Sequence, residues 1–260
     1  MKRGFSYILL IATLLCGSQT LWAWGQKGHR IIAQIAYDNL SCGTRRKIDK
    51  VLGAHGAVYL ANWPDEIKSD TIYKDSHNWH YQDLPAGLSD EALVACLTDY
   101  PQEGGNLFRA IDSLTTVLQH DKKNKTALVF LVHLTGDRFC PMHMGHLDDL
   151  GGNRVKCKWF GQNTNLHSIW DGKIIESQGY SYSEYAQFLA HKYASQKQEI
   201  QAMSEADVLR HNYALTTDIY NYHAAWNGNT YHYIYRWAAP MEWQLYAAGI
   251  RLAKLLEEIY

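Results

Sequence analysis

The segment from Thr126 to Arg138 is almost wholly apolar and constrains the fold more than any other stretch of the chain. A helix that is apolar around its whole circumference belongs in a protein interior, so we expect a buried central helix here. This helix would carry His133 and Asp137 on one face, because residues four apart in a helix are neighbours. A buried carboxylate is unfavourable unless a cation or hydrogen-bond donors accompany it. The two side chains can therefore satisfy each other, or they can bind a metal ion together.

Helical periodicity continues along most of the chain, and no convincing set of alternating strands appears. The predicted helices are Ile31–Leu40, Thr44–Leu52, Leu107–Leu118, Thr126–Arg138, Tyr185–Tyr193 and Pro240–Ile259. Two segments, Val58–Pro101 and His143–Leu166, are rich in Gly, Asp, Asn and Trp and are predicted to be long loops. We therefore predict an all-α fold with one mainly helical domain.

The first residues predict a secretory signal peptide over residues 1–23. Lys2 and Arg3 precede an apolar stretch, Ile8 to Cys16, that is too short to span a membrane. Cleavage after Ala23 would make Trp24 the new N-terminus and leave residues 24–260 as the exported domain. We expect this domain to be periplasmic or secreted, to be a monomer, and to have no stable membrane insertion.

The charge of the chain argues against binding phosphate groups without bound cations. The leader holds two basic residues and no acidic one, so its removal changes the formal net charge from −1 to −3. Proteins that bind nucleic acid by themselves usually present a basic surface. The chain has 13 histidines, all of them after Ala23, and these are the expected ligands for such cations.

Four cysteines follow the predicted cleavage site: Cys42, Cys96, Cys140 and Cys157. Export permits disulfides, and four cysteines allow three pairings between which the sequence does not choose. One possible bridge, between Cys140 and Cys157, would close the glycine-rich loop between them. The spacings do not predict a cysteine-based zinc site.

Further histidines and aspartates extend the pattern set by His133 and Asp137. His167 and Asp171 repeat the four-residue spacing on a second predicted helix. The full set of expected ligands is His29, Asp65, His80, His133, Asp137, His143, His167 and Asp171, with the α-amino group of Trp24 added after cleavage. Imidazoles and carboxylates are ligands that zinc takes, and the absence of thiolates favours open catalytic zinc over closed structural zinc.

In their order and spacing these motifs resemble those of the secreted trinuclear-zinc nucleases. This family comprises fungal single-strand-specific nucleases and plant bifunctional nucleases with their bacterial relatives, and it shares its fold with zinc-dependent phospholipases C. The matching motifs are Trp24-Gly25-x-x-Gly28-His29, Trp63-Pro64-Asp65, His80-Tyr81-x-Asp83, His133-x3-Asp137-x5-His143, Gly151-Gly152-Asn153 and Asn165-Leu166-His167-x3-Asp171.

The resemblance implies a helical domain with three zinc ions per chain in a cleft. The implied ligands are Asp65, His80 and His133 for one ion, Trp24 and His29 for a second, Asp137 as a bridge between these two, and His143, His167 and Asp171 for the third. The implied reaction is hydrolysis of single-stranded DNA and RNA to 5′-phosphate products, together with 3′-nucleotidase activity. In this reaction Asp65 would assist the attacking water and Lys68 would bind the phosphate.

The resemblance also implies where a base would bind. Tyr81 would stack on the base and Asp83 would accept a hydrogen bond from its edge. Gly151, Gly152 and Asn153 would bring the main chain close to the same base. Stacking requires an unpaired base, which favours single-stranded substrates.

The family usually has a glutamine-like residue before Pro141, where this chain has Cys140. We expect this departure to change the support of the loop and not the ligation of metal.

Three other functions are consistent with parts of the sequence. A phospholipase C could use the same metal core, although Tyr81 and Asp83 favour a base over a lipid. A secreted zinc-binding or storage protein would close each ion with protein ligands, whereas the third predicted site has only three. An exported structural protein would leave the His and Asp residues as satisfied core groups, which the number of matched ligands disfavours.

Overall fold

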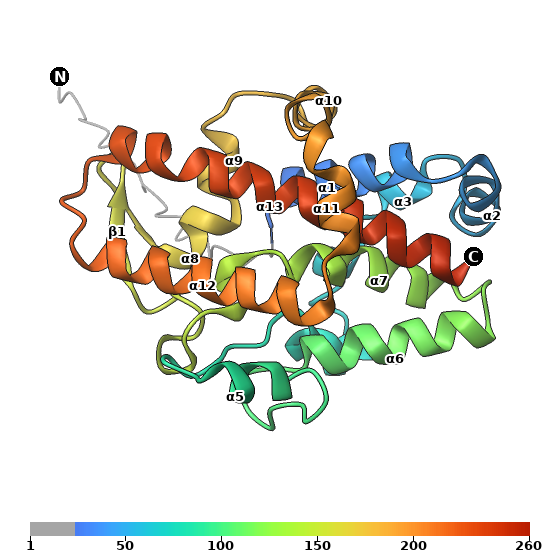
Figure 1. Ribbon diagram of the computed structural model, residues 1–260, viewed down its shortest axis with the longest axis horizontal. Coiled ribbons are helices and arrows are strands. Elements are labelled where there is room, and N and C mark those ends of the chain that lie inside the picture. Colours follow the sequence, from blue (N-terminus) through green and yellow to red (C-terminus); the bar gives the residue numbers. More distant parts are fainter. Residues whose placement is uncertain (1–23) are drawn as a thin grey trace, which may run out of the picture.

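The computed structural model describes residues 24–260, so the predicted signal peptide lies outside the described residues. Nearly all regular structure in this range is helical, and the prediction of one mainly helical domain is confirmed (Figure 1). The longer helices are α1 (Gln26–Asn39), α2 (Cys42–Leu52), α6 (Leu107–His120), α7 (Lys125–Asp137), α10 (Tyr182–Lys192), α12 (Glu205–Ala224) and α13 (Thr230–Ile259). The shorter ones are α3 (Gly56–Tyr59), α4 (Trp63–Glu66), α5 (Asp90–Ala95), α8 (Leu166–Ser168), α9 (Ile174–Glu176) and α11 (Lys197–Ala202).

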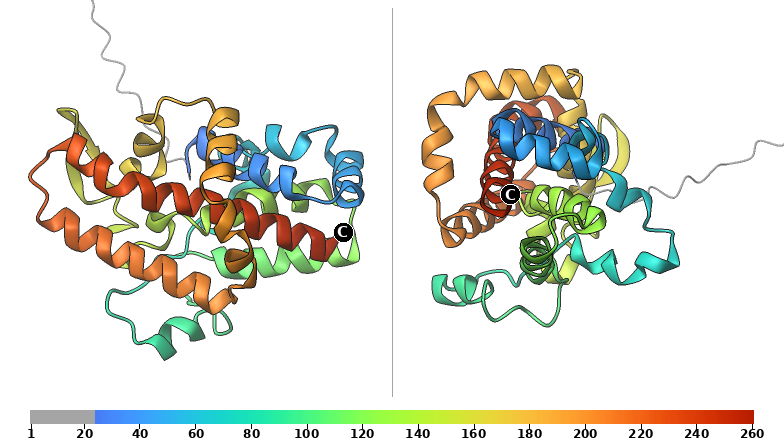
Figure 2. Two further views of the ribbon diagram at one scale, coloured as in Figure 1. Left: turned by 45° about the horizontal axis from the view of Figure 1, so that its top comes forward. Right: turned by 90° about the vertical axis from the view of Figure 1, so that its right-hand side faces the viewer.

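Helix α7 is the buried central helix that the sequence predicts. Every residue from Ala127 to Asp137 is buried, and the helix begins where the Asn124 side chain accepts a hydrogen bond from the N–H of Ala127. Helices α6, α1 and α13 pack against α7, while α1 also packs against α13 and α10. The end-on view of Figure 2 shows α1, α7 and α13 side by side, with α10 and α11 outside them.

The C-terminal helix is longer than predicted. It begins at Thr230 and contains Pro240, where the sequence analysis placed its start. The Asn229 side chain caps it by accepting from the N–H of His232, and the buried Tyr233 and Trp237, four residues apart, anchor its first turns. A proline removes one helical hydrogen bond, and here packing on both sides of that position outweighs the loss.

Helix α12, which the sequence analysis did not predict, runs antiparallel to α13 (Figure 1). A capping box starts it: Ser204 accepts from the N–H of Asp207, and the Asp207 side chain accepts from the N–H of Ser204. Its apolar face is narrow, because buried polar residues such as Asn212 and Thr216 interrupt it. The capping box is the sequence signal that could have identified this helix.

One predicted loop contains a β-hairpin. Strands β1 (Lys156–Trp159) and β2 (Gln162–Asn165) pair antiparallel, with Trp159 opposite Gln162. Both residues of the connecting turn have positive φ, +46° at Phe160 and +78° at Gly161, as the tight turns of two-residue hairpins require. The same segment holds the 3₁₀ turn η3 (Leu147–Asp149), and η2 (Pro141–Met144) overlaps its start.

Two other segments depart from the predicted secondary structure. The predicted loop Val58–Pro101 holds α4, α5 and the 3₁₀ helix η1 (Thr71–Trp79). A further 3₁₀ turn, η5 (Ala194–Gln196), follows α10. The second predicted ligand helix is one turn of α8 that continues as the π-helical turn η4 (Ile169–Lys173). A π-helical turn is rare and is frequently found at functional sites.

The expected disulfide bonding is wrong for the described residues. All four cysteines between residues 24 and 260 are free. Cys140 is buried just before η2, Cys157 lies on β1, and Cys42 and Cys96 belong to two further helical segments.

None of the helices between residues 24 and 260 combines the length and the apolar composition that crossing a bilayer requires.

Candidate metal centre

Five of the expected ligands converge around one end of α7. His133 and Asp137 come from α7, His29 from α1, Asp65 from α4, and His80 from the position that follows η1. All five side chains are buried, and His133 and Asp137 have no solvent exposure. We call these five residues the inner cluster. The structure thus brings together residues that are more than 100 positions apart in the sequence.

Asp137 lies at the middle of the inner cluster and uses its two carboxylate oxygens for different partners. Oδ1 lies 3.2 Å from Nε2 of His29. Oδ2 lies 3.0 Å from Nδ1 of His80 and 3.2 Å from Nε2 of His133. Asp65 Oδ1 is 3.6 Å from the same nitrogen of His133. Asp137 therefore has the position of a bridge between two sets of ligands.

The remaining expected side-chain ligands, His143, His167 and Asp171, form an outer cluster. His143 lies in η2, His167 in α8 and Asp171 in the π-helical turn η4. His143 Nε2 is 3.7 Å from Asp171 Oδ1, and His167 Nε2 is 4.0 Å from Asp171 Oδ2. His143 also connects the two clusters, because its Nδ1 lies 3.7 Å from Asp137 Oδ1.

Main-chain carbonyl groups orient three of the imidazole rings. His133 Nδ1 bonds to Ala61 O at 2.7 Å, His143 Nδ1 to His80 O at 2.5 Å, and His167 Nδ1 to Gly151 O at 2.7 Å. A carbonyl oxygen only accepts, so Nδ1 carries the proton in each ring. Each Nε2 is then left with a lone pair directed at a cluster, which is how metal-binding histidines are commonly held.

Several ligand atoms in the two clusters have no hydrogen bond within the described chain. Buried atoms of this kind include Nε2 of His29 and of His143, Oδ2 of Asp65, and Oδ1 of both Asp137 and Asp171. Buried polar groups are normally satisfied, so these atoms indicate ions or water that belong to the site. Three groups of three ligand atoms, each group within 4.8 Å, could hold a metal: His29, Asp65 and His133; His80, His133 and Asp137; and Cys140, His143 and Asp171.

Burial keeps three of the histidines in the neutral form that binds a metal. Burial lowers the pKa of His29 and of His80 to about 4, and that of His167 to about 3. Although burial opposes the charged form of Asp137, the neighbouring His133 and His143 hold its pKa well below the ordinary value. At neutral pH His29, His80 and His167 therefore offer neutral imidazoles and Asp137 offers an ionised carboxylate, the species that zinc binds. His143 differs, because the carboxylates of Asp137 and Asp171 outweigh its burial and raise its pKa to about 9, so a metal ion must displace a proton there.

A cavity of about 310 Å³ lies beside the outer cluster. Its lining residues are Lys68, His77, His80, Tyr81, Asp83, Met142, His143, Leu150, Asn153 and His167. Tyr81 and Asp83 follow His80 on a segment with isolated β-bridges at Gln82 and Leu84, so alternation along this extended segment points Tyr81 and Asp83 to the same side. Burial raises the pKa of Asp83 to about 8.

Lys68 connects the cavity with the inner cluster. Its Nζ lies 2.5 Å from Asp65 Oδ1, and its side chain is 30% exposed. A permanent positive charge at the rim of a cavity, next to a group of carboxylates, suits an anionic substrate.

The glycine loop, which consists of Gly151, Gly152 and Asn153, packs against the wall of the cavity. Gly151 has φ +60°, and a Cβ atom on it would lie 2.3 Å from the carbonyl oxygen of Met142 and 2.8 Å from Oδ1 of Asp83. Gly152 has φ +81°, and its Cβ would crowd Met142 and His167. The two glycines are therefore required by close packing. Asn153 follows them at the cavity wall, where its amide donates to the carbonyl of Leu150.

The Trp24 side chain is fully buried beside α7, and its indole N–H donates to the carbonyl of Gly136 at 2.8 Å. The N–H of the next residue, Gly25, donates to the carbonyl of Asp171. These bonds fix the start of the described chain next to elements that carry ligands of both clusters. The freed amine depends on cleavage after Ala23, which lies outside the described residues.

Two residues of the cavity wall, Leu150 and His77, lie outside the motifs that the sequence shows. Leu150 is 50% exposed at the cavity and has φ +58°, a strained conformation for a residue with a side chain. His77, which the motifs do not include, also lines the cavity, and its Nε2 bonds to Lys68 O at 2.6 Å. Neither residue belongs to a recognisable motif, so only the folded chain reveals its position.

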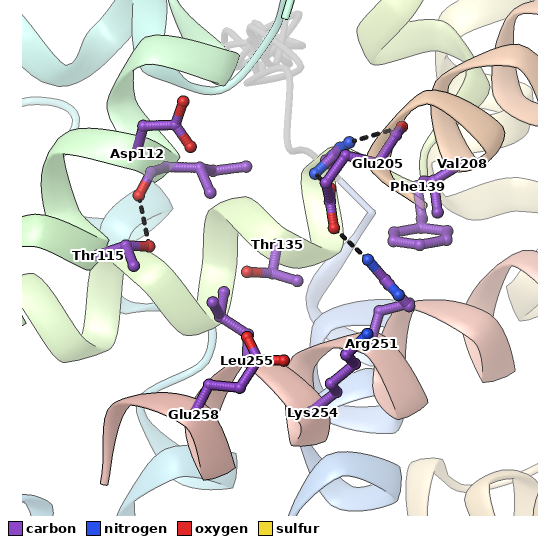
Figure 3. A pocket seen from close by; sticks show the side chains of 12 residues that line it. Asp112, Thr115, Thr135, Phe139, Glu205, Val208, Arg251, Lys254, Leu255 and Glu258 are labelled. Carbon is purple, nitrogen blue, oxygen red and sulfur yellow. Dashed lines mark hydrogen bonds and ion pairs between the residues drawn. The ribbon is translucent and has the colours of Figure 1, made fainter. Parts of the chain in front are cut away.

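A second cavity, of about 240 Å³, lies between α6, α7, α12 and α13 (Figure 3). Glu205 pairs there with both Arg138 and Arg251. The lining also holds Asp112, Glu258 and Lys254, so three acidic residues face three basic ones. Because these charges balance, we assign this cavity to the packing of the helices and not to a ligand.

Comparison with known proteins agrees with the resemblance seen in the motifs. Residues 24–260 match the family described as S1/P1 Nuclease. Endonuclease 3 of Arabidopsis thaliana is 33% identical over 186 residues, which are 67% of this chain and 63% of that protein. Nuclease S1 of Aspergillus oryzae is 31% identical over 181 residues, 66% of this chain and 61% of that protein. Nuclease P1 of Penicillium citrinum is 29% identical over 158 residues, 57% of each chain.

The aligned part of the chain thus spans less than two thirds of the length of each of these relatives. The family match, by contrast, extends over the whole described range. From residue 24 to residue 260, this chain belongs to the S1/P1 nuclease family.

Proposed function

We propose that this protein is a zinc-dependent nuclease that hydrolyses single-stranded DNA and RNA to 5′-phosphate products and also acts as a 3′-nucleotidase. One observation carries the proposal: five imidazoles and three carboxylates converge in the interior, with unsatisfied ligand atoms, next to a cavity that contains Lys68, Tyr81 and Asp83. Membership in a nuclease family supports the same reaction.

The donor set of the two clusters fits three zinc ions. We propose that the inner cluster, completed by the amine and carbonyl of Trp24, holds two ions and that the outer cluster holds the third. The position of Asp137 supports a bridging role, because one carboxylate oxygen faces His29 while the other faces His80 and His133. Buried carboxylates and imidazoles without thiolates in the inner cluster are ligands typical of catalytic zinc.

When bound, zinc lowers the pKa of a coordinated water to about 7 and polarises phosphoryl oxygens. The remaining contributions come from the chain itself. Lys68 is placed to bind a non-bridging phosphate oxygen, because its Nζ lies at the rim of the cavity next to Asp65. Asp65 has a carboxylate oxygen without a hydrogen bond, and we propose that it accepts a proton from the attacking water.

Base binding is assigned to the cavity beside the outer cluster. The ring of Tyr81 supplies a stacking surface, and the carbonyl oxygen of the Asp83 carboxyl group, which burial keeps largely protonated at neutral pH, can accept a hydrogen bond from the amino group of a base. Leu150 and Asn153 complete the wall, and Gly151 lets the main chain approach without a side chain. Because a paired base offers no free face for stacking, we propose single-stranded substrates.

We further propose that the protein is exported and cleaved after Ala23, because this cleavage creates the free amine of Trp24. The buried indole of Trp24 supports a fixed position for this amine.

The test uses the mature chain, produced with Trp24 as its true first residue. Single-stranded DNA, single-stranded RNA, a 3′-nucleotide and phosphatidylcholine vesicles are offered in parallel, with chelator, without chelator, and with zinc restored. We expect nucleic acid to be cut to 5′-phosphate products, the activity to vanish with chelator, and zinc to restore it. Asp137→Asn should lose activity and bound zinc together, whereas the exposed control Asp148→Asn should keep both.

Two results would contradict the proposal. Release of phosphocholine with nucleic acid left intact would make the protein a phospholipase C. Tight binding of zinc without hydrolysis of any of the four substrates would favour a zinc-binding protein.

A further inference from the structure

Cys140 lies against the outer cluster, although the sequence analysis gave it only a supporting role in the loop. The side chain is fully buried and the thiol is free. Its Sγ, a ring nitrogen of His143 and a carboxylate oxygen of Asp171 all lie within 4.8 Å of one another. The sulfur of Cys140 is therefore close enough to these His143 and Asp171 atoms to be a third ligand of the same ion.

Local geometry explains why Cys140 and His143 face the same ion site. Cys140 precedes the 3₁₀ turn η2, and His143 is the third residue of that turn. A 3₁₀ helix has three residues per turn, so side chains at positions i and i+3 point in the same direction. Pro141 fixes the first residue of the turn in the required conformation.

The two partners of Cys140 have free ligand atoms. The Nδ1–H of His143 is already used by the carbonyl of His80, and its Nε2 is buried without a hydrogen bond. Oδ1 of Asp171 is also buried without one, and it lies 3.7 Å from that Nε2. Ligand atoms of one tetrahedral zinc stand about 3.3–3.8 Å apart, given bond lengths of about 2.0–2.3 Å. The separation between His143 and Asp171 is therefore already that of two ligands of one ion.

We infer that Cys140 binds the ion of the outer cluster through its sulfur, together with His143 and Asp171. This inference rests on the proposed zinc centre. As the sulfur–metal bond forms, the thiol proton leaves to solvent and the sulfur binds as a thiolate.

A thiolate ligand changes which metal ion the outer cluster prefers and how tightly it is held. With His167 included, the outer cluster has four protein ligands: one sulfur, two nitrogens and one carboxylate. Four protein ligands hold zinc more tightly than three, and a thiolate selects zinc over the harder magnesium and manganese. A substrate oxygen would then join as a fifth ligand, as catalytic zinc sites permit.

Zinc X-ray absorption of the mature, zinc-loaded protein tests the inference without reference to activity. We expect one sulfur neighbour per three zinc ions at about 2.3 Å, distinct from nitrogen and oxygen at about 2.0–2.2 Å. Cys140→Ser should remove this sulfur signal. The variant should also release one zinc at a chelator concentration that is lower than the wild-type protein requires by about tenfold or more. The exposed thiol of Cys42 provides the matched control, and Cys42→Ser should leave the signal unchanged.

A second variant avoids any change at position 140. Replacing Cys42, Cys96 and Cys157 by serine leaves Cys140 as the one thiol of the mature chain, and the sulfur signal should persist.

The outcomes separate this inference from the proposed function. Zinc bound by nitrogen and oxygen alone, with nucleic acid still hydrolysed, overturns the role of Cys140 and leaves the nuclease proposal intact. A sulfur signal that survives Cys140→Ser also overturns it and points to the thioether of Met142, which lines the cavity. A protein that binds no zinc overturns both proposals.

Discussion

The Nδ1–H of His167 donates a 2.7 Å hydrogen bond to the main-chain carbonyl of Gly151, so the glycine loop sets the orientation of an outer-cluster ligand. The same glycine lies against Asp83, because a Cβ atom on it would come within 2.8 Å of Oδ1. One residue without a side chain therefore controls both the ring of His167 and the wall of the cavity.

Gly151→Ala should distort this site, because the new methyl group would overlap the carbonyl oxygen of Met142, 2.3 Å away. We expect loss of the outer zinc, measured as metal per chain. The free energy of unfolding should also fall by more than the positive φ of the new alanine causes by itself. Gly161→Ala is the matched control, since Gly161 also has a positive φ, +78°, but no atom within 4 Å of its Cβ position. The strain common to both is about 1–2 kcal/mol. Equal losses of stability and zinc in both variants would contradict the role of Gly151.

Lys68→Met should lower kcat by about 10²–10³-fold while zinc content stays unchanged, because the variant loses a charge aimed at the phosphate. The comparison is Lys74→Met, a change at an exposed lysine on η1, which should have wild-type kcat. If Lys68→Met loses zinc along with activity, the lysine supports the ligand Asp65 and does not bind the phosphate.

Tyr81→Ala should weaken binding of single-stranded substrates by about 1–3 kcal/mol, the typical contribution of one stacked base. Tyr81→Phe keeps the ring and should retain most of the affinity. KM for a short oligonucleotide, measured beside Tyr231→Ala at a 76% exposed tyrosine, distinguishes stacking from a general loss of aromatic surface. An unchanged KM for Tyr81→Ala would remove this residue from the binding site.

Asp83→Asn should change how the stability of the metal-free protein depends on pH. Burial raises the folded-state pKa of Asp83 from 3.8 to about 8, so between these values the folded state holds a proton that the unfolded state has lost. Wild-type stability must then fall as pH rises through this window, and this contribution vanishes in the variant. In urea unfolding with chelator present, the free energy of unfolding of the variant should rise relative to that of the wild type between about pH 4 and about pH 8. A constant difference across this range would refute the burial effect.

An added residue before Trp24 should remove one zinc ion from the mature protein. The extension converts the α-amine of Trp24 into an amide, which is a poor metal ligand, while the buried indole keeps its bond to Gly136. Zinc per chain and activity are compared between the extended and authentic proteins. Equal zinc content would show that the terminus does not bind metal.

Local sequence patterns were sufficient to predict the helices that carry one strong signal, either a continuous apolar run or a periodic apolar face. The apolar run of α7 and the periodic face of α6 predicted helices close to their observed bounds, whereas α1 begins at Gln26, five residues before its predicted start at Ile31. Helix α13 begins at Thr230, ten residues before the start that Pro240 predicts, because packing on both sides of the proline carries the helix through it. Helix α12 was not predicted, since its polar buried residues find partners only in the folded chain, as Asn212 does at the carbonyl of Arg138.

The sequence by itself determined the residues that could bind metal, because imidazole and carboxylate groups in a helical spacing of four have few other uses in an apolar segment. It also determined family membership through the order of these motifs. Only the tertiary structure decided how the groups are shared: Asp137 faces two sets of histidines, main-chain carbonyls fix the rings, and Cys140 lies within reach of the outer cluster. The physical reason is that these relations depend on contacts between segments far apart in sequence, whereas a spacing reports only on neighbours within one helix or turn.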